Sequence, residues 1–297
     1  MESRKLKSLQ KFLKIRLAFP EKWNIVPIEA TPTDKKERKR MKIYIFADLE
    51  GISGVSNSEY INGNAHFVEL GRKFMAEDIN SCIAGCFDAG ATEVIVRDGH
   101  GAGVNVDPSL IDPRATLIQG AAPHGVRFPD IEGSVGMILL GYHAMAGTEG
   151  ALLEHSYSSR AIQNMWLNDR RVGEIGIDAA IASEHNVPVL MVSGDDKACK
   201  EAILWLPHIR ACEVKRSYST QGTRLISPAN AHKRIQEAAL DAVKNYQRAK
   251  LMKVDYPATL RTEYIERVAP PCRLDDRLVD GRTVERTGDS IEKLLLG

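Results

Sequence analysis

The 297-residue sequence predicts an α/β protein in which a sheet rich in parallel strands is flanked by helices, with a smaller α+β portion at the C-terminal end. Two observations support this prediction. Short apolar runs alternate with stretches of helical periodicity as far as residue 205, which is typical of parallel strands joined by helices. Beyond residue 217 the chain changes to one long helical stretch and a strand in which polar and apolar residues alternate.

The first three elements show the pattern most plainly. Residues 42–46 are β-prone and, after Lys42, apolar, and residues 69–89 repeat apolar side chains near helical spacing, with Gly90 as the C-cap. Residues 92–96 form a short buried strand. Strand, helix and strand in this order predict a right-handed parallel unit.

The remaining elements follow from the same signals. We expect strands at residues 116–119, 135–142, 164–167 and 188–192, helices at 173–184, 195–205, 228–247 and 291–296, and an antiparallel strand at 258–268. We divide the chain into a basic extension at residues 1–40, an α/β domain at 41–216 and a smaller α+β portion at 217–297 that contributes to assembly.

Charge is unevenly distributed along the chain. Residues 1–40 contain twelve Lys and Arg against five Asp and Glu, whereas the whole chain has a net charge of only +1. The body is therefore mildly acidic, which argues against a nucleic-acid surface. We expect the extension to be disordered, a packing arm, or an upstream or appended segment before Met41; a short amphipathic helix for a membrane surface or for targeting is the alternative.

The cysteines and the hydropathy pattern indicate the compartment. The five cysteines form no CxxC pair, and reduced core thiols explain them best. No apolar run reaches the roughly 18 residues of a membrane span. The N-terminus also lacks the apolar core of a secretory signal. We therefore expect a cytoplasmic protein without a membrane partner.

Two carboxylates, Asp48 and Glu50, stand at the end of the first strand, directly before Gly51. Side chains two residues apart on a strand project from the same face. Neighbouring carboxylates repel each other unless a cation or a proton lies between them. The pair therefore predicts either a metal site or, as the simpler alternative, two exposed acids at a strand end.

Further metal-binding residue types stand at the ends of two other expected strands. Asp98 and His100 follow the strand at 92–96, and His143 follows the strand at 135–142. Ligands of open α/β sheets collect outside the carboxyl ends of the parallel strands. Each histidine alone is more often structural, but together they favour a divalent metal with nitrogen and oxygen ligands: zinc, or else manganese or cobalt.

For two later residues, the sequence pattern alone does not decide between a functional and a structural role. His155 lies in a polar loop, where a surface histidine is the simpler interpretation, and Glu174 lies at a helix start, where an acid stabilises the helix dipole. Residues 99–103 lack the spacing of a dinucleotide-binding loop, and the serines beside His155 lack the G-x-S-x-G turn of a serine hydrolase.

In the order of its motifs, the chain resembles the DppA-type D-aminopeptidases of peptidase family M55. The resemblance runs from about Met41 to the C-terminus. The segments that carry it occur in the family's order at family-like intervals, so the set is specific: residues 48–54, 98–100, 140–144, 155–156, 168–170, 172–176, 187–192 and 194–196. The extension at residues 1–40 departs from the family, because it precedes the usual start.

The resemblance implies a site, a cofactor and an assembly. It implies two zinc ions per subunit, bridged by Asp48, and a catalytic His155 that is described in the family as the nucleophile. Family members form rings, decamers in the known case, so a homo-oligomer acting on a short peptide is implied. The implied zinc ligands are Asp48, Glu50, His100, His143 and Glu174.

The expected function is that of a zinc-dependent aminopeptidase. It would hydrolyse the N-terminal residue of short peptides, D-alanine-type residues in particular, by a metal-activated water assisted by His155. Acid–base work or oxyanion stabilisation suits this imidazole better than nucleophilic attack. Two alternatives stay open: a dinuclear metallohydrolase of a phosphoester or cyclic amide, and a non-catalytic, metal-stabilised α/β domain that binds a ligand.

Overall fold

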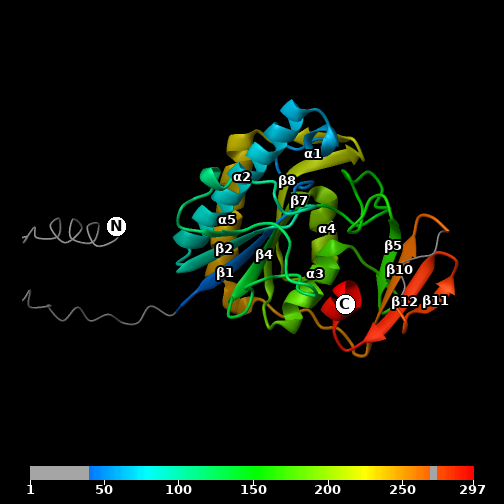
Figure 1. Cartoon of the computed structure of the whole chain (residues 1–297). Coiled ribbons are helices and arrows are strands. Elements are labelled where there is room, and N and C mark those ends of the chain that lie inside the picture. The colour runs from blue at the N-terminus through cyan, green and yellow to red at the C-terminus, as the bar shows by residue number, and fades with distance from the viewer. Residues whose placement is uncertain (1–39, 268–272) are drawn as a thin grey trace, which may run out of the picture. The chain divides into compact units, whose positions relative to one another are not determined.

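Two β-sheets organise the chain (Figure 1). The computed structural model describes residues 40–267 and 273–297, and within them the larger sheet has seven strands in the order β3-β2-β1-β4-β7-β8-β9. Neighbours pair in parallel except β9, which is antiparallel to β8. The strands are β1 (Lys42–Ala47), β2 (Glu93–Asp98), β3 (Thr116–Ile118), β4 (Gly136–Tyr142), β7 (Val189–Asp195), β8 (Arg210–Ser219) and β9 (Gly222–Leu225).

Helices cover both faces of the larger sheet (Figure 1). On one face α2 (Ala65–Asp88) packs against α5 (Pro228–Lys244), and the single turn α1 (Glu59–Asn62) lies beside the start of α2. The other face is covered by α3 (Glu174–Glu184) and α4 (Asp196–Trp205), and the short α6 (Ile291–Leu296) packs on α3.

The side chains of β1 divide the apolar interior into two cores. Ile43 and Ile45 point into the core shared with α2 and α5, whereas Tyr44 and Phe46 point into the core shared with α3. All four side chains are buried. Because complete burial of such a side chain contributes about 1.5–3 kcal/mol, packing on both faces holds this strand firmly at the centre of the sheet.

The smaller sheet is antiparallel and has the order β11-β12-β10-β5-β6 within the described residues. It lies beside α3 and α6 in Figure 1 and contributes Met165, Leu167 and Leu260 to the second core. Its strands are β5 (Ile162–Leu167), β6 (Arg170–Arg171), β10 (Ala258–Tyr264), β11 (Arg277–Asp280) and β12 (Thr283–Gly288).

The predicted fold class is confirmed: a largely parallel sheet flanked by helices is joined to a smaller antiparallel sheet. The turn α1 and the strands β8, β9, β11 and β12 were not among the expected elements. The division of the chain at residue 217 stays a prediction; β8 runs across that position, and β5, which pairs with β6, also pairs with the C-terminal strand β10. The expected extension, apart from Arg40, lies outside the described residues.

Candidate metal centre

The predicted ligands come together because their strands are parallel neighbours. β1 lies between β2 and β4, with Ala47 in register with both Asp98 and Leu140. The chain therefore leaves all three strands at the same edge of the sheet. Asp48 and Glu50 follow β1, His100 follows β2 and His143 follows β4 directly.

Asp48, Glu50 and His100 form the first of two triads. His100 Nδ1 lies 3.1 Å from Asp48 Oδ1 and 3.0 Å from Glu50 Oε2. The carboxylates are almost fully buried, each 6% exposed. One ligand atom from each residue lies within 4.8 Å of the others, so the triad could hold a metal ion.

His143, His155 and Glu174 form the second triad. His143 Nε2 lies 3.3 Å from Glu174 Oε1, and His155 Nε2 lies 3.7 Å from the same oxygen. The two imidazole rings are stacked, with centroids 4.0 Å apart and an interplanar angle of 10°. Glu174 is buried at the first position of α3, and Gly173 is its N-cap.

Asp48 connects the two triads. Its Oδ1 faces His100, while its Oδ2 lies 3.5 Å from His143 Nε2. Each oxygen of one carboxylate thus faces a different triad, which is the arrangement that a carboxylate bridging two metal ions requires.

Hydrogen bonds set which nitrogen of each histidine faces the second triad. His143 Nδ1 lies 3.0 Å from Ala144 O and His155 Nδ1 lies 2.9 Å from Leu153 O. A carbonyl only accepts, so each Nδ1 carries a hydrogen, and Nε2 is the nitrogen of each ring that faces the centre. His143 Nε2 is buried and makes no hydrogen bond to any described residue. A buried nitrogen between two carboxylates fits a metal cation once that nitrogen carries no proton.

The charges of the site shift several pKa values. Burial acts to lower the pKa of His100, but Glu50 and Asp48 outweigh it and raise that pKa to about 11. The pKa of His143 is also raised, because Glu174 outweighs burial. Burial acts to raise the pKa values of Asp48 and Glu174, and the neighbouring histidines lower both. Asp48 and Glu174 therefore stay ionised and stabilise a positive charge beside them, on a protonated histidine or on a metal.

A buried lysine holds the loop that carries Glu50. Lys215 of β8 is 1% exposed, and its Nζ donates to the carbonyls of Glu50, Ile52 and Val55 at 2.6, 2.7 and 2.7 Å. Three acceptors match the three donors of an ammonium group. No sequence signal singled out this residue, because a lysine on a strand usually points to solvent.

A buried glutamate binds the backbone close to His143 of the second triad. Glu201 of α4 is 4% exposed, and its Oε2 accepts from Met145 N at 2.7 Å. Its Oε1 lies so close to Gly173 that a Cβ there would sit 2.7 Å from it. Burial raises the pKa of Glu201 to about 7. Sequence reasoning missed this residue as well, because it sits in an ordinary helical pattern.

Asp98 and Asp195 have structural roles. Asp98 Oδ2 accepts from Asn105 N at 2.6 Å and from Val106 N at 3.1 Å, so it fixes the loop after β2 and stays out of the two triads. Asp195 caps α4 by accepting from Lys197 N and Ala198 N, as expected for an acid at a helix start.

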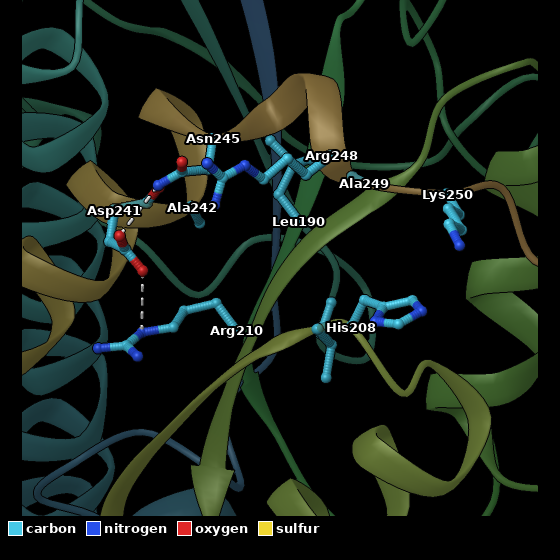
Figure 2. A pocket seen from close by; sticks show the side chains of 10 residues that line it. Leu190, His208, Arg210, Asp241, Ala242, Asn245, Arg248, Ala249 and Lys250 are labelled. Atoms are coloured by element: carbon cyan, nitrogen blue, oxygen red, sulfur yellow. Dashed lines mark hydrogen bonds and ion pairs between the residues drawn. The ribbon is translucent and has the colours of Figure 1, made fainter.

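A cavity of about 260 Å³ adjoins the two triads, with Glu50 and His155 in its lining. A larger one of about 500 Å³ lies elsewhere, between the start of β8 and the end of α5 (Figure 2). In that cavity Arg210 reaches Asp241 across 3.7 Å, and none of the expected ligands lines it. The smaller cavity is therefore the one suited to bring a substrate to the triads.

The chain belongs to peptidase family M55, whose model, described as D-aminopeptidase, matches residues 41–295. A D-aminopeptidase of Bacillus subtilis (strain 168) is 36% identical over 211 residues, which cover 71% of this chain and 76% of that protein. The solved structure of the Zn-dependent D-aminopeptidase DppA from Bacillus subtilis, described as a self-compartmentalizing protease, superposes with a TM-score of 0.79 at 31% identity. The match covers 85% of this chain and 93% of that one.

These similarities confirm the family resemblance and the class of enzyme. The protein is a hydrolase of the metallo-aminopeptidase class, with the fold of its zinc-dependent relative. In the part of the chain that the structure describes, no helix is long and apolar enough to cross a membrane.

Proposed function

We propose that this chain hydrolyses the N-terminal residue of short peptides, D-alanine-type residues in particular, at a centre of two zinc ions per subunit. The proposed ligands are Asp48, Glu50, His100, His143 and Glu174. The observation that carries the proposal is the orientation of Asp48, whose two oxygens face two different ligand groups. Family membership and the zinc dependence of the relative support the choice of metal and reaction.

The chain's own residues provide ligands and a proton carrier. Zinc bound at such a centre would act as a Lewis acid and lower the pKa of water towards 7. His155 presents the Nε2 lone pair beside Glu174, so we assign it the movement of a proton between water and the departing amine. His155 also lies within ligand distance of the second triad, and its alanine variant distinguishes the two roles.

We further propose that the subunits assemble as a ring, a decamer, that works in the cytoplasm on peptides. The self-compartmentalizing relative supports a ring. The four cysteines within the described residues are free and buried, which supports a reducing compartment. We propose that residues 217–297 contribute to the contacts between subunits.

Hydrolysis of paired D-alanine and L-alanine amides tests the proposal. We expect the D-alanine amide to be cleaved, the activity to disappear with a chelator, and zinc to restore it. Cleavage of the L-alanine amide alone would overturn the D-specificity, and activity that survives complete removal of metal would overturn the zinc mechanism. A phosphoester substrate is less suited, since no Lys or Arg lines the cavity beside the centre among the described residues.

A further inference from the structure

The cavity beside the centre is acidic. Glu50, Glu154 and His155 are the ionisable residues that line it. The other lining residues are uncharged, and no Lys or Arg is among the described residues of the lining. Glu50 is 6% exposed, and its Oε2 lies 3.0 Å from His100 Nδ1. A cavity with this lining favours a cationic group over an anionic one.

A backbone hydrogen bond positions Glu154 in this lining. Its Oε2 accepts from Gly147 N at 2.6 Å, and the carboxylate forms no ion pair with any described residue. The preceding Leu153 has a φ of +48°, and its N–H donates to Thr220 O at 3.1 Å. A strained backbone that the surroundings hold in place is typical of a functional loop.

The two carboxylates that line the cavity differ in whether they belong to a metal-binding triad. Glu50 belongs to the first triad, so a metal ion there would use its negative charge. Glu154 belongs to neither triad, and its charge is left for a ligand. An aminopeptidase acts on the end of a peptide that carries an α-ammonium group, and a fixed carboxylate is the usual partner for such a cation.

We propose that Glu154 binds the α-ammonium group of the substrate and so makes the enzyme select free amino termini. This inference rests on the proposed aminopeptidase function. Glu154 is a specificity residue in this account: it sets which peptide end enters the cavity, next to the histidine that moves the proton.

The test compares D-alanine p-nitroanilide with propionic acid p-nitroanilide, which lacks only the amino group. Glu154→Gln keeps an acceptor for Gly147 N–H but removes the charge. We expect its KM for D-alanine p-nitroanilide to rise about tenfold or more, with kcat little changed, because a charge-assisted hydrogen bond is lost. The preference of the wild type for the amine over its analogue should shrink by the same factor.

Glu149→Gln is the matched control. Glu149 is exposed in the same loop and does not line the cavity, so both substrates should behave as in the wild type. Unchanged KM and preference in Glu154→Gln, or loss of its zinc, would overturn the role of Glu154 while leaving the proposed function intact. A wild type that cleaves neither substrate would overturn both.

Discussion

His155 is constrained on three sides. Its Nδ1 donates to Leu153 O, its ring stacks on His143, and its Nε2 lies 3.7 Å from Glu174 Oε1. The stacking and the carbonyl contact fix the orientation of the ring. The free lone pair at Nε2 is therefore held where a proton can be taken up and returned without the ring having to move.

The alanine variant of His155 separates proton transfer from metal binding. We expect His155→Ala to keep its zinc but to lose turnover by a factor of about a hundred or more, the range typical of a lost general acid–base group. Metal analysis and kcat of the same preparation check this. Loss of one zinc from the variant would make His155 a ligand, and full activity would remove it from the mechanism.

Zinc binding should compete with protons at His100 and His143. The pKa of His100 is about 11 without metal, so this imidazole is charged at neutral pH and must lose its proton before it can coordinate. Its pairing with Glu50 and Asp48 stabilises the metal-free fold fully below pH about 6.5, the unfolded value, and that stabilisation is lost as pH rises towards 11.

Zinc affinity should therefore rise with pH. We expect an increase of about tenfold per pH unit for each proton displaced between pH 7 and 9. Competition with a chromophoric chelator of known pH dependence measures it. An affinity independent of pH over this interval would show that neither histidine carries a proton in the metal-free protein.

At the scale of elements, strand β1 is anchored at both ends by lysines. Lys42 Nζ donates to Asp130 O and Glu132 O at 2.6 and 3.0 Å near the start of the strand. Lys215 does the same for Glu50, Ile52 and Val55 beyond its end. One anchor lies at the edge of the sheet that carries the ligands, and the other lies at the opposite edge.

This symmetry supplies a matched pair of variants. Lys42→Met and Lys215→Met should both lower the free energy of unfolding, Lys215→Met by about 3 kcal/mol because it leaves three buried hydrogen bonds to carbonyls unmade. Only Lys215→Met should also weaken zinc binding, since only Lys215 holds the loop of Glu50. Equal zinc affinity in the two variants would show that Lys215 supports the fold and not the centre.

The part of the structure that could be predicted from the sequence follows from local patterns. Apolar runs marked β1, β2, β4 and β7, and the polar residues at their ends marked the candidate ligands. The pairing of β5 with β10 carried no such signal: β10 lies some ninety residues further along the chain, and the two strands share an apolar core with α3 and α6. Lys215 and Glu201 were missed because their burial depends on acceptors and donors supplied by distant loops.

At the scale of the whole molecule, the expected ligands and both sheets lie between Met41 and the C-terminus, and the family model spans residues 41–295. Arg40 contributes an ion pair with Glu93 at 2.7 Å, in which its side chain is 75% exposed. Surface pairs of this kind are worth about 0–1 kcal/mol. This ion pair should thus add little to the stability of the body.

A chain that begins at Met41 should bind zinc and cleave the D-alanine amide as the full chain does. Activity assays and sedimentation of the two chains side by side check this. A shorter chain that is inactive or fails to assemble would give the basic extension a necessary role.

The number of zinc ions per chain tests the central claim most directly. Metal analysis should find two in the wild type, close to none in Asp48→Ala and about one in Glu50→Ala, because the Asp48 oxygens face both ligand groups and Glu50 faces only the first. A wild type with a single zinc, or an Asp48→Ala variant that keeps two, would contradict a centre bridged by Asp48.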